Sequence, residues 1–160
     1  MAGLEDLYRE IILDHYRAPR NRGELAVPPA HRVEGFNPLC GDEVVLYLDV
    51  ENGIVTDVKI AGQGCSISQA STSMMSAAVK GKPVAEARTI TRAFKALMSI
   101  HESKIGGDGE EVDGADELEG VRLGDLEALQ GVVKFPVRIK CATLAWNTLT
   151  QGLDEIGAAK

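Results

Sequence analysis

The dipeptide Asn52-Gly53 separates two runs of residues that favour β-structure. Residues 43–50 before it are rich in valine, leucine and tyrosine, and Ile54, Val55, Val58 and Ile60 follow it. Asn-Gly between two such runs is the strongest short-range signal for a two-residue hairpin turn. The sequence therefore predicts two antiparallel strands in this region rather than a strand–helix–strand unit.

Helical periodicity surrounds this predicted hairpin. Apolar residues recur at three- and four-residue intervals and predict helices at about 4–16, 67–79, 91–101, 123–130 and 137–156. Ser66 and Gln69 match a capping box at the start of the second helix. With a further short strand at 33–36, we expect an α+β fold, a small antiparallel three-stranded sheet packed against several helices.

Length and charge limit the class of protein. The 160 residues are 44% hydrophobic, and we expect a single domain over 1–160. The formal charge of -7 argues against nucleic acid or an anionic membrane as the main partner. No apolar run approaches the roughly 20 residues of a spanning helix. The N-terminus is amphipathic rather than a basic region followed by an apolar one, so we expect a cytoplasmic protein.

One segment differs in kind from the rest of the chain. Residues 106–120 contain five glycines and seven acidic residues, with no lysine or arginine. The residues outside it balance at seventeen basic and seventeen acidic. Such a composition lacks the apolar surface needed to fold by itself. We expect a flexible acidic insertion at about 106–120.

The three cysteines, Cys40, Cys65 and Cys141, form an odd set that excludes a closed disulfide framework. Cys40 lies in a loop two residues before Asp42, and the other two adjoin predicted helix starts. Three thiols and one carboxylate would complete a tetrahedral ligand set for a soft or borderline metal. Inert, buried cysteines are the alternative from the residues alone. We expect His15 to be exposed or half-buried rather than a ligand.

Four stretches of the chain carry a resemblance to a known family. They are His15-Tyr16 with Pro19-Arg20-Asn21, Asn37-Pro38-Leu39-Cys40-Gly41-Asp42, Gly64-Cys65-Ser66-Ile67-Ser68-Gln69-Ala70-Ser71, and Arg138-Ile139-Lys140-Cys141 with Leu144-Ala145. In order and in content they resemble the IscU-like family of iron–sulfur cluster assembly proteins. Lys140 stands where the IscU scaffolds carry histidine. That difference and the acidic insertion resemble the SufU branch.

The resemblance implies a zinc site with Cys40, Asp42, Cys65 and Cys141 as its ligands. Three thiolates and a carboxylate around Zn²⁺ sum to a formal charge of about -2, so the site needs positive neighbours or solvent. Arg138 and Lys140 are candidates to supply that positive charge. The alternative is that both belong to a solvated first helical turn.

The resemblance also implies a role for the site. Proteins of the SufU branch accept persulfide sulfur from a SufS-type, pyridoxal-phosphate-dependent cysteine desulfurase and stimulate it. We expect Cys40 to be the sulfur acceptor, because a loop thiol can move with less rearrangement than a helix-anchored one. The sulfur would pass to downstream Suf assembly components. A scaffold for a [2Fe–2S] cluster on the same residues and a purely structural zinc site are the alternatives.

Overall fold

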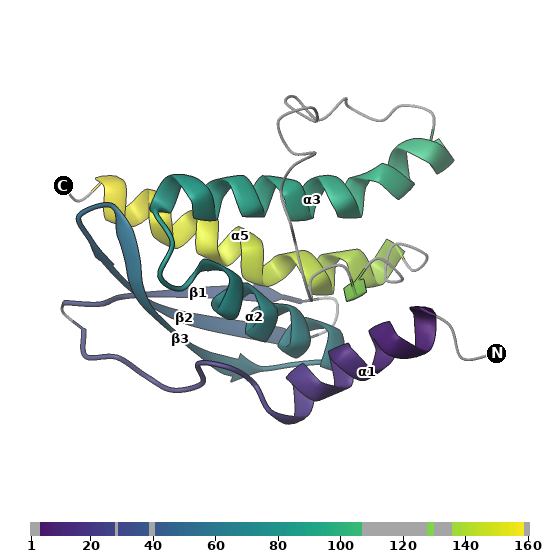
Figure 1. Ribbon diagram of the computed structural model, residues 1–160, viewed down its shortest axis with the longest axis horizontal. Coiled ribbons are helices and arrows are strands. Elements are labelled where there is room, and N and C mark those ends of the chain that lie inside the picture. The colour runs from purple at the N-terminus through teal and green to yellow at the C-terminus, as the bar shows by residue number, and fades with distance from the viewer. Residues whose placement is uncertain (1–3, 28, 39–40, 107–127, 130–135, 159–160) are drawn as a thin grey trace.

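The three strands form one antiparallel sheet in the order β1-β2-β3 (Figure 1). In this computed structural model, β1 spans His31–Asn37, β2 spans Asp42–Glu51 and β3 spans Ile54–Gln63. The structure describes residues 4–27, 29–38, 41–106, 128–129 and 136–158. The predicted three-stranded meander is confirmed, and each strand is longer than its apolar run suggested.

The turn between β2 and β3 has the conformation that its sequence predicts. Asn52 and Gly53 have φ angles of 53° and 76°. Two successive residues with positive φ make the turn that matches the twist of a hairpin. Along β2, Val44, Leu46 and Leu48 are buried at alternate positions and join the core between the sheet and the helices.

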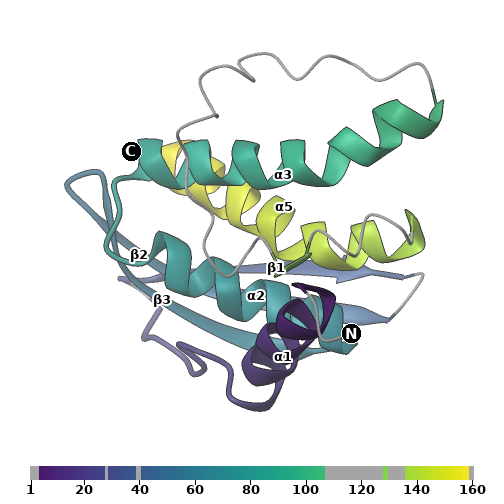
Figure 2. The same ribbon diagram turned by 45° about the vertical axis from the view of Figure 1, so that its right-hand side comes forward.

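The described residues form four helices beside this sheet. They are α1 (Leu4–Arg17), α2 (Ser66–Val79), α3 (Val84–Gly106) and α5 (Pro136–Ala158). α2 contacts β3, and α5 contacts β1 and β2, so these two helices share one face of the sheet (Figures 1 and 2). α3 packs on α5 and α2, farther from the strands, while α1 packs on α2. This arrangement confirms the predicted α+β class.

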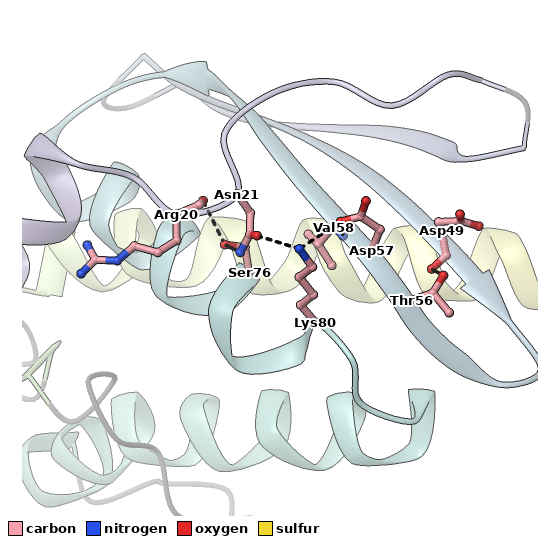
Figure 3. Close-up of polar contacts among 8 residues, drawn as sticks. All are labelled: Arg20, Asn21, Asp49, Thr56, Asp57, Val58, Ser76 and Lys80. Atoms are coloured by element: carbon pink, nitrogen blue, oxygen red, sulfur yellow. Dashed lines mark hydrogen bonds and ion pairs between the residues drawn. The ribbon is translucent and has the colours of Figure 1, made fainter.

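The segment after α1 joins α2 to the outer edge of β3. Asn21, with a φ angle of 59°, donates from Nδ2 to Ser76 Oγ at 3.1 Å and accepts from Lys80 Nζ at 3.3 Å (Figure 3). Its backbone carbonyl accepts from the N–H of Ile60 in β3 at 2.9 Å. Lys80 also pairs with Asp57 of β3 at 3.4 Å. The motif around Asn21 is therefore a structural link between helix and sheet.

The predicted boundaries of α3 were wrong. The helix begins at Val84 and ends at Gly106, whereas the sequence indicated about 91–101. The N–H of Ala87 bonds to the carbonyl of Pro83 at 2.9 Å, so helical bonding starts at the proline. Pro83 directly precedes α3, where its missing N–H would have no helical partner in any case.

Two further local predictions were wrong. The residue that caps α2 is Cys65, not Ser66, and Gln69 donates its backbone N–H to the carbonyl of Cys65 as an ordinary helical bond. His15 is buried, with 2% of its surface exposed, because α1 packs on α2 and its Nδ1 lies 2.8 Å from Ser73 Oγ. A buried histidine needs such a polar partner.

Two predictions fall on parts of the chain that lie outside the described residues. Of the acidic insertion at 106–120, only Gly106 is described, as the last residue of α3. Of the predicted helix at 123–130, only Ala128 and Leu129 are described, and both side chains are buried in the core. The single domain over 1–160 and its flexible insertion remain predictions. Among the described helices, none is both long and apolar enough to cross a membrane.

Candidate metal centre

Asp42 opens β2 at the end of the sheet. It pairs in register with Asn37, the last residue of β1, and none of its surface is exposed. Its Oδ1 accepts the backbone N–H of Cys65 at 2.8 Å, and its Oδ2 lies 3.8 Å from Cys65 Sγ. A buried carboxylate is stable only with such partners. The strand end therefore holds a carboxylate against the start of α2.

Cys65 is the N-cap of α2, with extended backbone angles of φ -70° and ψ 166°. Its sulfur accepts the backbone N–H of Ser68 at 3.4 Å, in the place where an oxygen of Ser, Thr, Asp or Asn usually stands. The N-terminus of a helix carries a partial positive charge, which suits an anionic ligand. The side chain of Cys65 is half-buried.

Cys141 lies one turn into α5 and is fully buried. The next residue, Ala142, accepts through its carbonyl from Ser71 Oγ of α2 at 2.5 Å. Ser71 Oγ accepts in turn from Trp146 Nε1 at 3.2 Å, and the ring of Trp146 stacks on Phe94. This Ser71–Ala142–Trp146 contact fixes the register of α5 against α2. It thereby sets the position of Cys141 along α5 relative to the start of α2.

These three residues converge although they lie far apart in sequence. One ligand atom from each of Asp42, Cys65 and Cys141 can be chosen so that all lie within 4.8 Å of one another. Tetrahedral coordination by sulfur and oxygen separates ligands by about 3.3–3.8 Å, as bond lengths of about 2.0–2.3 Å require. Two sulfurs and one carboxylate are donors that suit a borderline metal ion, and a spread of up to 4.8 Å would have to contract by about 1 Å around it.

Gly64 lets the end of β3 pass close to the carboxylate. A Cβ atom at this position would lie 2.5 Å from Asp42 Oδ1 and 3.0 Å from Asp42 Cα. Real Cβ contacts are not that short, so any side chain here would displace Asp42. The glycine before Cys65 is thus required by the geometry of the site.

The other predicted site residues have different outcomes. Cys40 lies outside the described residues, although the residues on both sides of its loop are described. Arg138 and Lys140 are exposed on the first turns of α5. Their predicted contribution to the charge of the site remains a prediction.

Sequence reasoning missed two residues that hold the site together, Ser71 and Asn37. Asn37 Nδ2 lies 3.9 Å from Cys141 Sγ. Both residues lie within the motifs quoted for the family resemblance, which was the only signal that pointed to them. Neither carries a metal-ligating group of the kind that a sequence search for ligands would select.

Comparison with known proteins agrees with this geometry. The family described as NifU-like N terminal domain matches residues 7–142. The chain is 45% identical over 152 residues to the zinc-dependent sulfurtransferase SufU of Bacillus subtilis, covering 95% of this chain and 92% of that protein. It is 37% identical over 160 residues to the iron–sulfur cluster assembly scaffold protein IscU of Streptococcus pyogenes, covering all of this chain and 91% of that protein.

Solved structures show the same fold. FiSufU from Fervidobacterium islandicum superposes with a TM-score of 0.73 at 32% identity, covering 94% of this chain and 99% of that one. A NifU-like N-terminal protein from Brucella abortus gives a TM-score of 0.71 at 22% identity, covering 99% of this chain and all of that one. The second likeness shows the shared fold only.

Proposed function

Because the chain belongs to the NifU-like N-terminal domain family, we propose that it acts in iron–sulfur cluster assembly as a zinc-dependent sulfur acceptor. The observation that carries the proposal is the convergence of Asp42, Cys65 and Cys141 within 4.8 Å. Two sulfur donors and one oxygen donor fit Zn²⁺, which binds cysteine and carboxylate ligands in tetrahedral sites. The similarity to SufU selects zinc among the borderline metals.

Cys40 would be the fourth ligand. The N–H of Gly41, the residue after Cys40, bonds to the carbonyl of Asn37 at the end of β1 at 2.8 Å. Two peptide units limit the distance between the Cα atoms of Cys40 and Asp42 to about 7 Å. This chain connection would allow the thiol of Cys40 to reach the other three donors. Bound zinc would keep the sulfurs deprotonated and hold them together.

The same positions favour Cys40 as the sulfur acceptor. Cys65 caps α2 and Cys141 is buried inside α5, so moving either sulfur disturbs a helix. A loop residue has no such constraint. The Cys40 thiolate would attack the outer sulfur of a cysteine persulfide on the donor enzyme. A new S–S bond forms on Cys40, the donor's S–S bond breaks, and its electron pair leaves with the donor's cysteine as thiolate.

The partner that supplies this persulfide would be a SufS-type, pyridoxal-phosphate-dependent cysteine desulfurase, with downstream Suf components receiving the sulfur. The shared Suf context of the SufU relative supports this assignment. Arg138 and Lys140 are exposed on α5 near Cys141, and we propose that they offset the negative charge of the loaded site. Transfer of this kind would take place in the cytoplasm.

A [2Fe–2S] scaffold on the same four residues is the second candidate, supported by the similarity to IscU of Streptococcus pyogenes. Lys140 favours the acceptor, because the family resemblance implies histidine at this position in a scaffold and this chain has lysine. Metal analysis of the purified protein separates the two. Stoichiometric zinc in a colourless protein supports the acceptor, whereas iron and sulfide in a brown protein support the scaffold.

The decisive experiment measures alanine formation from cysteine by a SufS-type desulfurase with and without the zinc-loaded protein. We expect stimulation by the wild type and none by Cys40→Ala, provided that circular dichroism shows the variant folded. Stimulation retained in the folded variant would remove Cys40 as acceptor. A desulfurase rate indifferent to the wild-type protein would contradict the acceptor role.

A further inference from the structure

Asn37 links the parts of the candidate metal centre that belong to different elements. It is the last residue of β1, and only 7% of its surface is exposed. Its Nδ2 donates to Cys141 Sγ in α5 at 3.9 Å, across 104 positions of sequence. A side chain that served only the sheet would not need an amide group at this buried position.

The backbone of Asn37 contacts two further residues at this end of the sheet, Gly41 and Asp42. Its carbonyl accepts the N–H of Gly41, the residue that follows Cys40 in the sequence, at 2.8 Å. It also pairs in register with Asp42, the carboxylate of the site. Asn37 thus contacts Gly41 and Asp42 through its backbone and Cys141 through its side chain.

We infer that Asn37 is a positioning residue of the metal centre, whose amide holds the Cys141 sulfur in place and withdraws electron density from it. This inference rests on the proposed metal site. A thiolate can only accept hydrogen bonds, and the amide group of asparagine offers two donors. Hydrogen bonds to a charged acceptor are roughly twice as strong as neutral ones. The 3.9 Å contact is long for an N–H donor to sulfur, and we expect it to shorten when Cys141 is a metal-bound thiolate.

The amide would also stabilise the negative charge of the metal-loaded site, because a neutral N–H group can do so without a positively charged side chain. Cys65 Sγ accepts the N–H of Ser68, Asp42 accepts the N–H of Cys65, and Cys141 Sγ accepts from Asn37. Each described ligand therefore has one neutral N–H donor. Such donors stabilise a negative ligand set and orient it before the metal binds. An aspartate at position 37 would keep the shape of the side chain but repel the sulfur.

The test compares Asn37→Asp and Asn37→Ser with the wild type. Zinc affinity is measured by competition with a chromophoric chelator, and Co²⁺ serves as a spectroscopic probe of the sulfur ligands. Asn147→Asp is the matched control, because it adds the same charge on an exposed position of α5. Loss of a hydrogen bond to a metal ligand typically lowers affinity by about 10- to 100-fold, which we expect for Asn37→Asp. Asn147→Asp should match the wild type.

The Co²⁺ spectrum separates positioning from general stability. In Asn37→Ser, the short side chain cannot reach Cys141, and the more electron-rich sulfur should move the thiolate-to-Co²⁺ charge-transfer band to lower energy. Unchanged affinity and an unchanged band in the Asn37 variants would overturn the inference while leaving the metal site intact. Failure of both variants to fold would assign Asn37 to stability and overturn it as well. A wild type that binds neither metal would defeat the proposed function itself.

Discussion

The carboxylate of Asp42 accepts the backbone N–H of Cys65 at 2.8 Å through one oxygen and faces the sulfur of Cys65 at 3.8 Å with the other. The side chain of Asp42 thus holds Cys65, the N-cap residue of α2, and offers a ligand atom beside the thiol of Cys65. The strand end and the helix start are coupled before any metal binds. Substitutions at this contact should separate structural from ligating roles.

Two substitutions of Asp42 distinguish its role as a metal ligand from its role as a hydrogen-bond acceptor. Asp42→Asn keeps an oxygen that can accept the Cys65 N–H, whereas Asp42→Ala leaves that N–H unpaired in a buried site. We expect both variants to lose zinc affinity. Only the alanine variant should also lose about 1–3 kcal/mol of unfolding free energy without metal. Chelator competition and denaturation in the presence of chelator measure the two effects, and equal apo stability of the variants would contradict this reading.

Gly64→Ala tests the close approach of β3 to the carboxylate. The added Cβ would lie 2.5 Å from Asp42 Oδ1, so the carboxylate or the strand must move. We expect weaker zinc binding and a loss of about 1–3 kcal/mol of stability, as for other overpacked sites. Gly157→Ala in α5 is the control, because a Cβ there meets nothing within 4 Å. It should be neutral or stabilise the helix.

Ser71→Ala tests the contact that sets the register of α5. It removes the donor to the carbonyl of Ala142 and the acceptor for Trp146 Nε1, both buried. Unsatisfied buried groups should cost about 1–3 kcal/mol in urea denaturation. Zinc affinity should also fall, because Cys141 precedes Ala142 in the helix. Thr89→Ala, at an exposed hydroxyl that bonds only within α3, should change both quantities little.

The pair between Asp14 and Arg20 predicts a pH dependence. The side-chain hydrogen bond from Arg20, and then its charge, hold the pKa of Asp14 below its usual value of 3.8. A carboxyl whose pKa is lower in the folded state adds stability above the unfolded value. That stability disappears as the pH falls through the folded value. The difference in unfolding free energy between wild type and Asp14→Asn should therefore become smaller in strong acid.

Thermal unfolding from neutral to strongly acidic pH measures this effect. The pair is exposed, so the effect should be small and should shrink with added salt. Glu24→Gln removes an exposed carboxyl that has no ion pair among the described residues, and serves as the control. A gap between Asp14→Asn and wild type that persists unchanged into strong acid would contradict the assigned cause.

Several elements could be predicted because their signals are local. Asn52-Gly53 dictates a turn with two positive φ angles, and the β-favouring runs on either side of it predict the two strands that it joins. The helices at 4–17 and 136–158 follow from their apolar spacing. Helix boundaries were predicted wrongly where a proline precedes a helix, as Pro83 does, and where an unusual atom caps a helix, as Cys65 Sγ does.

The sequence by itself determined which ligand types the chain carries, where its hairpin turns and which motifs it shares with its family. Only the tertiary structure decided that Asp42, Cys65 and Cys141 meet, that His15 is buried and that Asn37 donates to a sulfur 104 positions away. Turn chemistry and periodicity act over a few residues, where the backbone itself limits the outcome. Contacts across the chain depend on how α2 and α5 pack on the sheet, which no local pattern specifies.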